Sequence, residues 1–250
     1  MGLRITTNIS SVNAQKSMGT TTRALEKSYA QLSSGSRITK AADDAAGLSI
    51  SETLKSTIRG YGQAQRNSND AISLVQVAEG GLGEISNIMT RLRELAVQAS
   101  SDTVGDIERG FIDKEVQQLK NESERISQVT RYGSNHLLNG QGEGFDFQVD
   151  INNDDFNDRI SFQPQDINAT TAFLGVDGFD FSNKFSAREA LEVLESAQQT
   201  VNGHRATLGA IQNRFQSVIS NLNTTGQNLT ASRSRIQDTD FAMETANLTR

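Results

Sequence analysis

The sequence lacks cysteine and tryptophan and contains one proline and three tyrosines among its 250 residues. Without cysteine there is no disulfide framework, no thiolate nucleophile and no thiolate metal site. The scarcity of large aromatic residues argues against a thick aromatic core and favours helix faces built from small and aliphatic side chains. The composition therefore indicates a mainly helical chain of one or two domains.

Charge and hydropathy exclude further classes of protein. The formal net charge is −6, and the basic residues form no block along the chain. This pattern argues against a nucleic-acid partner held through its phosphates and against anionic membranes. There is no run of eighteen apolar residues, and the N-terminal stretch lacks the apolar core of a cleaved secretory signal. If the protein leaves the cell, we expect a route without signal cleavage.

Apolar residues recur every seven positions from Val201 onward, which predicts a long helix packed against partner helices. At about 1.5 Å per residue, this helix would extend for roughly 80 Å. The companion column is apolar as far as Val218 and then partly hydroxylic, so the helix should change or lose its partners past about residue 222. The main column consists of Val201, Leu208, Phe215, Leu222, Leu229, Ile236 and Met243.

Between residues 44 and 99 the apolar pattern broadens to three columns per heptad, which indicates burial among several helices. A polar stretch then interrupts the pattern, and a shorter helix over about 112–129 is expected to return antiparallel to the first. We expect the core of the resulting rod to form where the long N-terminal and C-terminal helices face each other. It should pack Leu82, Ile85, Met89 and Leu92 against Leu208, Ile211, Phe215 and Val218.

The first 40 residues carry only a narrow apolar stripe among serine, threonine, asparagine and glutamine. One narrow stripe cannot hold a helix by itself, because too little apolar surface is buried to offset the loss of chain entropy. We therefore expect the segment from the N-terminus to about residue 36 to be partly disordered in a single chain and to fold on assembly. The stripe consists of Ile5, Ile9, Val12, Met18, Leu25, Tyr29 and Leu32.

The hydrophobic period switches to two after residue 140. Alternation from Phe145 to Ile151, a polar turn and resumed alternation at Ile160 predict a short β-hairpin. The segment after it holds the only proline and indicates a loop with one more short strand. Ser186 and Glu189 stand three residues apart, as in a capping box, and should open the final helix. Both termini should lie at the same end.

The residues that could carry chemistry have simpler structural interpretations. Neither His136 nor His204 has a second histidine at metal-binding spacing, and His204 falls in the apolar seam of the last helix. The acidic stretch from residue 150 has Asp155 and Ser161 where a calcium loop needs glycine and glutamate, so a solvated turn is favoured. The paired aspartates at 43 and 44 suit the start of a helix. We expect no enzyme activity, no metal and no cofactor.

Four stretches resemble bacterial flagellin. They are the opening MGLRITTNISSVNAQ, the run LSSGSRITKAADDAAGLSI at 32–50, RLRELAVQAS from Arg91, and SRSRIQDTDFAMETANLTR near the end. The related hook–filament junction proteins typically have proline around the paired aspartates, whereas this chain has AADDAAGL. The resemblance therefore favours flagellin over the junction proteins.

The resemblance implies an inner-tube helix and spoke over 1–43 and a rod-domain long helix and return helix over 44–139. It further implies a β-hairpin region over 140–185, a C-terminal rod helix over 186–236, and the start of a return to the tube over 237–250. The outer variable domains of many flagellins are missing. Because the family usually continues to a leucine-rich helical end, the chain is either cut after Arg250 or an unusual subunit, and the resemblance favours a cut. A chain that ends at Arg250 is expected to be soluble and largely monomeric.

The function implied is that of a structural subunit of the extracellular flagellar filament, used for motility and exported by the flagellar type III apparatus without signal cleavage. Implied partners are other copies of the chain, the junction and cap proteins, and an export chaperone. Two alternatives remain. One is a junction or cap protein of the same appendage, and the other is a coiled-coil signalling hairpin, against which the β-hairpin argues.

The resemblance also implies recognition by the host Toll-like receptor for flagellin, through positions that match Arg91, Leu95 and Glu115. Arg91 and Leu95 are four residues apart and share a helix face, so a single patch with Glu115 on the return helix is geometrically possible. Two simpler interpretations stand beside it: Leu95 also fits the apolar stripe, and Arg91 with Glu115 could form an ordinary surface ion pair worth about 0–1 kcal/mol.

Overall fold

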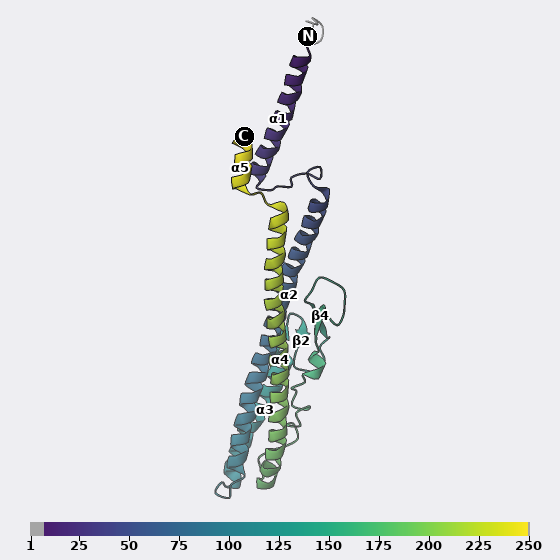
Figure 1. Ribbon diagram of the computed structural model, residues 1–250. Coiled ribbons are helices and arrows are strands. Elements are labelled where there is room, and N and C mark those ends of the chain that lie inside the picture. The colour runs from purple at the N-terminus through teal and green to yellow at the C-terminus, as the bar shows by residue number, and fades with distance from the viewer. Residues whose placement is uncertain (1–7, 250) are drawn as a thin grey trace. The chain divides into compact units, whose positions relative to one another are not determined.

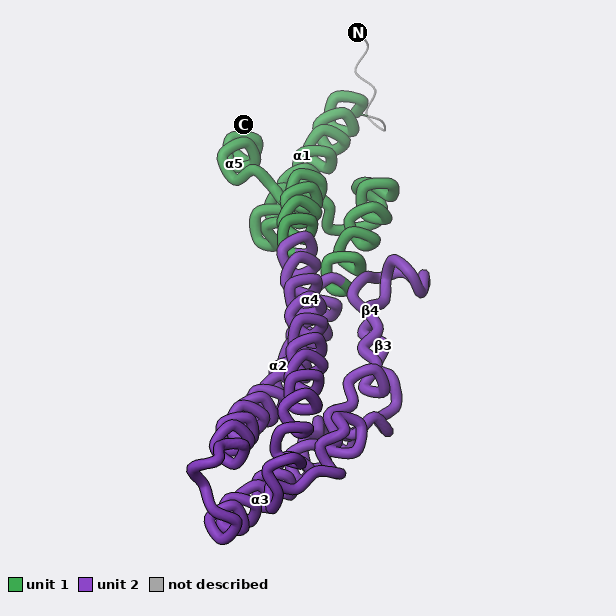
Figure 2. The backbone as a smooth tube through the Cα atoms, turned by 90° about the horizontal axis from the view of Figure 1, so that it is seen from below, with its two compact units in different colours: residues 1–60, 223–250 green, residues 61–222 purple. Residues whose placement is uncertain are grey.

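The computed structural model describes residues 8–249. This part of the chain forms five α-helices and two small antiparallel sheets, which confirms the predicted mainly α fold with a small β region (Figure 1). The chain divides into unit 1, residues 1–60 and 223–250, and unit 2, residues 61–222 (Figure 2). The helices are α1 (Ile9–Ser34), α2 (Ala45–Ala99), α3 (Asp106–Val129), α4 (Lys184–Gln237) and α5 (Phe241–Thr249).

Unit 2 is built on α3 and on the parts of α2 and α4 that lie inside it, which run side by side (Figures 1 and 2). The helices α2 and α4 are antiparallel, since Gln198 Nε2 donates to Ser86 Oγ at 2.7 Å and Arg205 lies 4.0 Å from Glu79. Their apolar columns face inward and form one core with residues of the hairpin region. The largest fully buried side chains include Leu74, Leu82, Ile85, Met89, Leu92, Phe162, Phe181, Leu194 and Phe215.

The register between α2 and α4 differs from the predicted one. Besides the Gln198–Ser86 hydrogen bond, Glu195 pairs with Arg93 at 3.6 Å. These contacts place residues 82–92 of α2 level with about residues 192–202 of α4. The predicted packing of 82–92 against 208–218 therefore does not hold. A heptad column fixes which face of a helix is buried, but it leaves the offset along the helix axis open.

The turn between α2 and α3 is closed by a buried arginine. Arg109 Nε donates to Ala99 O and Nη2 donates to Ser101 O, both at 2.9 Å. The carbonyl of Ala99, the last residue of α2, has no partner within the helix, so the first bond satisfies the C-terminus of α2 and the second holds the turn. Asp106 and Glu108 stand in the first turn of α3, where carboxylates favour the positive end of the helix dipole.

The long helix α4 starts two residues before the predicted Ser186. It begins at Lys184, and Asn183 Oδ1 accepts a hydrogen bond from Phe185 N at 3.1 Å. Asparagine is among the best residues for this position, because its side chain satisfies an amide that the helix leaves free. Leu222 is the last buried residue of α4. This confirms the prediction that the helix changes or loses its packing partners past about residue 222.

The predicted hairpin is confirmed. Strand β3 (Phe145–Gln148) pairs with β4 (Arg159–Phe162), with Phe145 opposite Phe162. A second hairpin of β1 (Arg131–Tyr132) and β2 (Asn135–His136) was not predicted, because two-residue strands show no periodicity. After β4 the expected extra strand is replaced by a 3₁₀ turn, η1 (Pro164–Asp166), and an isolated bridge between Asn139 and Asn168.

Unit 1 contains both ends of the chain, with α1, α5, the start of α2 and the end of α4 (Figure 2). The helices α1 and α5 pack on each other. The heptad column does not continue in a single helix, because α4 ends at Gln237 and Met243 lies on the separate α5. Among residues 8–249, no helix is long and apolar enough to cross a membrane.

Candidate functional surfaces

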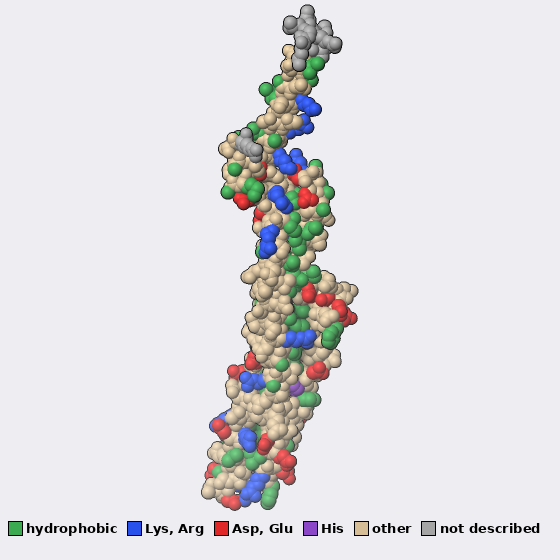
Figure 3. Space-filling model, viewed as in Figure 1, with side chains coloured by type: hydrophobic (Ala, Val, Ile, Leu, Met, Phe, Trp, Pro, Cys, Tyr) green, Lys and Arg blue, Asp and Glu red, His purple; other side chains and the backbone are tan. Residues whose placement is uncertain are grey.

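The apolar stripe of α1 lies on the surface of unit 1. Met18 is 72% exposed, and Gln31 is the only buried residue among the 26 of the helix. Leu32 is half-buried, and the predicted Ile5 lies outside the described residues. Lys and Arg side chains also follow this helix in the view of Figure 3. The other stripe residues, all exposed, are Ile9, Val12, Leu25 and Tyr29.

The ends of α1 and α4 meet in a set of hydrogen bonds that we call the hub, formed by residues 35–37 and 236–239. Arg37 N donates to Gln237 O, and Arg37 Nη2 donates to Ile236 O, both at 2.6 Å. Thr239 N donates to Gly35 O at 3.0 Å, and Ser36 and Asp238 form an isolated bridge. Gly35, with φ of 69°, ends α1 in the left-handed conformation that glycine tolerates best.

The loop between α1 and α2 is organised by Asp43. Its Oδ2 accepts hydrogen bonds from Thr39 Oγ1 at 2.9 Å and Lys40 N at 3.1 Å, and Lys27 Nζ lies 3.2 Å from Oδ1. These contacts, led by the Thr39 hydroxyl, lower the pKa of Asp43 to about 2. Asp44 Oδ1 instead accepts from Gly47 N at 2.9 Å at the start of α2. The neighbouring carboxylates thus have separate structural tasks.

The predicted rod-core residues all lie in the interior of unit 2. Ile211 and Val218 are half-buried against the core. Phe215 is fully buried and meets the ring of Phe147 on β3 edge to face, at 5.7 Å between centroids. The remaining five, all at most 1% exposed, are Leu82, Ile85, Met89, Leu92 and Leu208.

The three positions expected to contact the Toll-like receptor do not form one exposed patch. Arg91 Nη2 and Nε donate to Glu115 Oε1 at 2.8 and 3.0 Å, and Arg91 Nη1 donates to Glu94 Oε2 at 2.9 Å. Leu95 is only 2% exposed, because it follows the apolar column of α2 into the core. The surface of this region is therefore formed by the ion pair, without the leucine.

Sequence reasoning missed a group of charged side chains on α3 that we call the α3 latch: Asp113, Lys120 and Glu124. Lys120 is 6% exposed, and its Nζ donates to the carbonyls of Asp177 at 2.6 Å and Phe179 at 2.9 Å. Burial lowers the pKa of this lysine. Asp113 accepts from Phe181 N and Glu124 accepts from Thr171 N, both at 2.9 Å.

The latch attaches the irregular stretch 171–181 to α3 and so holds the apolar side chains of that stretch in the core. Charged residues on a helix usually indicate a solvated face. The available signal was spacing: Asp113 and Lys120 lie three and four residues from the buried Val116, which places them on its face.

Neither histidine lies in an arrangement suited to catalysis. Burial lowers the pKa of His204, and its ring centroid lies 6.4 Å from that of Phe173. In the acidic turn after β3, Asp154 Oδ1 accepts from Phe156 N at 3.0 Å, and acidic side chains gather over this loop in Figure 3. Within residues 8–249, no group of His, Asp or Glu is placed to hold a metal ion.

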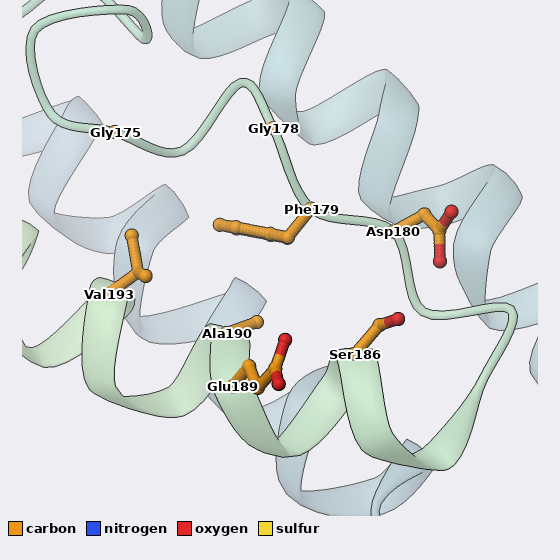
Figure 4. Close-up of a pocket in the computed structure, with 8 residues that line it drawn as sticks. All are labelled: Gly175, Gly178, Phe179, Asp180, Ser186, Glu189, Ala190 and Val193. Atoms are coloured by element: carbon orange, nitrogen blue, oxygen red, sulfur yellow. The ribbon is translucent and has the colours of Figure 1, made fainter.

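A pocket of about 270 Å³ lies between the loop at 175–180 and the first turns of α4. Figure 4 shows Ser186 and Glu189 extending from α4 toward this loop, with Phe179 on the opposite wall. Neither histidine is among the lining residues, so the hydroxyl of Ser186 has no imidazole base beside it. The other lining residues are Gly175, Gly178, Asp180, Ala190 and Val193.

Two protein-family models match the chain. The bacterial flagellin N-terminal helical region matches residues 5–143, and the bacterial flagellin C-terminal helical region matches residues 191–250. Between them these matches include the hub and nearly all of the helical core. They leave out the hairpin β3–β4 and the stretch held by the latch.

Relatives and solved structures agree. The chain is 38% identical to a flagellin of Halalkalibacterium halodurans over 97% of this chain and 88% of that protein, and 31% identical to Vibrio cholerae flagellin B over 100% and 93%. The crystal structure of Bacillus cereus flagellin superposes with a TM-score of 0.57 at 29% identity, covering 67% of this chain and 94% of that one. The chain belongs to the bacterial flagellin family and is a structural subunit of the flagellar filament.

Proposed function

We propose that this flagellin adds to the filament by burying the apolar stripe of α1 against neighbouring copies of itself. The observation that supports the proposal is the exposure of this stripe, from Ile9 at 66% to Tyr29 at 57%, along a helix with one buried residue. Water-exposed apolar area of this extent marks an interaction surface more often than a free surface. Phe241 and Met243 on α5, also exposed, would join it.

Folding of α1 would then be coupled to assembly. Ordering a residue costs about 1–2 kcal/mol of chain entropy, and the single subunit buries little of α1 to offset that cost. In the free subunit we expect weak amide protection over residues 9–32 and strong protection around Leu82 to Leu92 in unit 2. Hydrogen exchange on the monomer tests this, and strong protection of α1 without polymer would contradict it.

Elongation from sheared filament fragments tests the role of the stripe. Leu25→Ser and Met18→Ser should slow elongation in sedimentation and electron microscopy, whereas Ser17→Ala, which is exposed and lies on neither the Met18 face nor the Val12 face of α1, should leave it nearly unchanged. The melting of unit 2 serves as the folding control. Growth of the stripe variants at the normal rate would refute this surface. A wild-type subunit that blocks further growth would favour the junction or cap alternative.

We also propose an export route and a set of partner proteins. We expect export to the extracellular filament through the flagellar type III apparatus without signal cleavage, with an export chaperone, the junction proteins and the cap protein as partners. The thin burial in unit 1 supports passage of an unfolded chain. Mass spectrometry of the exported protein should show no loss of an N-terminal segment beyond the initiator methionine, and a shortened N-terminus would contradict this route.

Recognition by the Toll-like receptor for flagellin is proposed to use Arg91 and Glu115. Leu95 would contribute only from beneath the surface, since it is buried. Arg91→Ala should reduce receptor signalling by the monomer. Arg93→Ala is the matched control, because Arg93 is a similarly exposed neighbour on the same helix. Equal signalling by the two variants would remove this surface from consideration.

A further inference from the structure

The break between α4 and α5 contains neither of the residues that usually end a helix, glycine and proline. It spans Asp238, Thr239 and Asp240, and no glycine or proline occurs between residues 227 and 250. The heptad column continues across it, from Ile236 to Met243. By these criteria the segment should form one helix. The break between α1 and α2 differs, because Gly35 ends α1 there with a positive φ.

The hub replaces the hydrogen bonds that a continuous helix would make. In such a helix the amides of residues 239, 240 and 241 would donate to the carbonyls of residues 235, 236 and 237. In the structure, the carbonyls of Ile236 and Gln237 accept from Arg37, and the amide of Thr239 donates to Gly35 O. Residues 35–37 therefore satisfy the groups that helix continuation would otherwise use.

Two local features act in opposite directions. Asp240 Oδ1 accepts from Ala242 N at 2.9 Å and from Met243 N at 3.3 Å, which caps α5 and favours the break. Against this, the break forgoes helical hydrogen bonds in a sequence without helix breakers. The guanidinium of Arg37 at the carbonyl end of α4 adds a favourable interaction with the helix dipole, and it comes from 199 residues away in the chain.

We propose that the α4–α5 junction is a two-state element controlled by residues 35–37. When these residues are docked, α4 ends at Gln237 and α5 packs on α1. When they are released, α4 and α5 join into one continuous helix from Lys184 to Thr249. The state of the N-terminal segment thus decides the direction of the C-terminal one. The inference concerns unit 1 of a single chain and does not depend on the proposed mode of polymerisation.

The absence of cysteine allows a direct test in the full chain. Ala231→Cys on α4 and Ala246→Cys on α5, both exposed, carry spin labels whose separation is measured by electron–electron double resonance. In a continuous helix these positions are about 22 Å apart along the axis, at ~1.5 Å per residue. Carbon-13 secondary shifts of residues 238–240 report independently whether they are helical.

Two variants should favour the continuous helix, and one should forbid it. Arg37→Ala removes the bond to Ile236 O, and Asp240→Ala removes the cap of α5; each should raise the continuous population by about tenfold, as expected for the loss of one charged hydrogen bond. Phe241→Pro is the matched control. Proline is tolerated in the first turn of α5, but in a continuous helix it removes a hydrogen bond and clashes with the preceding turn.

The expected result is that Arg37→Ala and Asp240→Ala show the continuous-helix distance together with helical shifts at 238–240. The double variant Arg37→Ala with Phe241→Pro should keep the wild-type distance. The melting of unit 2 should be unchanged in every variant. Wild-type distances and non-helical shifts in both single variants would overturn the proposal, as would a continuous-helix distance in the proline double variant.

Discussion

Units 1 and 2 share the same helical periodicity of apolar residues, but these residues are buried in unit 2 and mostly exposed in unit 1. In unit 2 the columns of α2 and α4 are buried against α3 and the hairpin region, whereas Ile38 is the only buried apolar residue in the described part of unit 1. The contrast within α4 is the clearest, because its column is buried to Leu222 and only half-buried at Leu229. A repeat of apolar residues therefore predicts a contact surface, but the partner can belong to the same chain or to another one.

The largest expected effect comes from emptying the core of unit 2. Phe215→Ala should reduce the free energy of unfolding by about 3–5 kcal/mol, because a fully buried ring is removed from contact with Phe147. Met18→Ala in α1, 72% exposed, is the control in unit 1 and should change it by less than about 0.5 kcal/mol. Chemical denaturation measures both values. Similar losses of unfolding free energy in the two variants would show that the units do not differ in how much their apolar residues contribute to stability.

A buried lysine and an exposed one sharpen the comparison. Lys120→Met should cost about 1–3 kcal/mol, because the carbonyls of Asp177 and Phe179 lose their donor. Lys27→Met should cost less than about 1 kcal/mol, since the Lys27 side chain is half-exposed. Urea unfolding at neutral pH gives both values, and equal losses would show that the latch contributes no more than a surface pair.

The pH dependence of Lys120 has a definite sign. Burial lowers its pKa below the ordinary value of 10.5, so the unfolded chain binds the proton more tightly. The contribution of Lys120 to stability should therefore rise as the pH increases from the lowered pKa through 10.5. Subtracting the free energy of unfolding of Lys120→Met, measured over the same pH range, from that of the wild type isolates the contribution of Lys120. A wild-type profile that falls more steeply than that of the variant in this window would contradict the assignment.

Glycine-to-alanine substitutions should have effects of opposite sign in the two units. A Cβ at Gly81 would lie 2.7 Å from Leu138 Cδ1 and 2.8 Å from Thr130 Oγ1, so Gly81→Ala should cost about 1–3 kcal/mol. A Cβ at Gly19 in α1 meets nothing within 4 Å, and Gly19→Ala should raise the helicity of α1 through about 0.5–1 kcal/mol of helix propensity. Thermal melts of unit 2 and circular dichroism test the two changes.

The smallest expected effect is a local acid transition in unit 1. The pKa of Asp43 is about 2, below the ordinary 3.8, so its contribution is present above pH 3.8 and lost as the pH falls through about 2. The amides of Thr39 and Lys40 should shift over this range in an NMR titration, because they donate to its carboxylate. Asp43→Asn should remove the transition. A midpoint near 3.8 would mean that the loop does not hold Asp43.

The sequence predicts much of unit 2, because burial there follows periodicity. The columns at 82–92 and 201–222, and the existence of the β3–β4 hairpin, follow from periods of seven and two. The offset between α2 and α4 is set by contacts such as Gln198 with Ser86, which no period encodes.

The rest escaped prediction because it depends on contacts between distant parts of the chain. The α3 latch was missed because Lys120 binds main-chain carbonyls, which leave no mark on side-chain patterns. Leu95 could be assigned either to the column or to the surface from its spacing alone. The end of α4 at Gln237 is fixed by Arg37, far away in the sequence.

The α3 latch also bears on where foreign sequence can be carried. The stretch 171–181 has no regular secondary structure, yet three charged side chains hold its main chain and Leu174, Val176 and Phe181 are buried. A peptide grafted there would disrupt the interior. The turn between β3 and β4 is exposed at 151–157, and its own side chains close it. That turn is the better position for displaying an epitope on every copy along a filament.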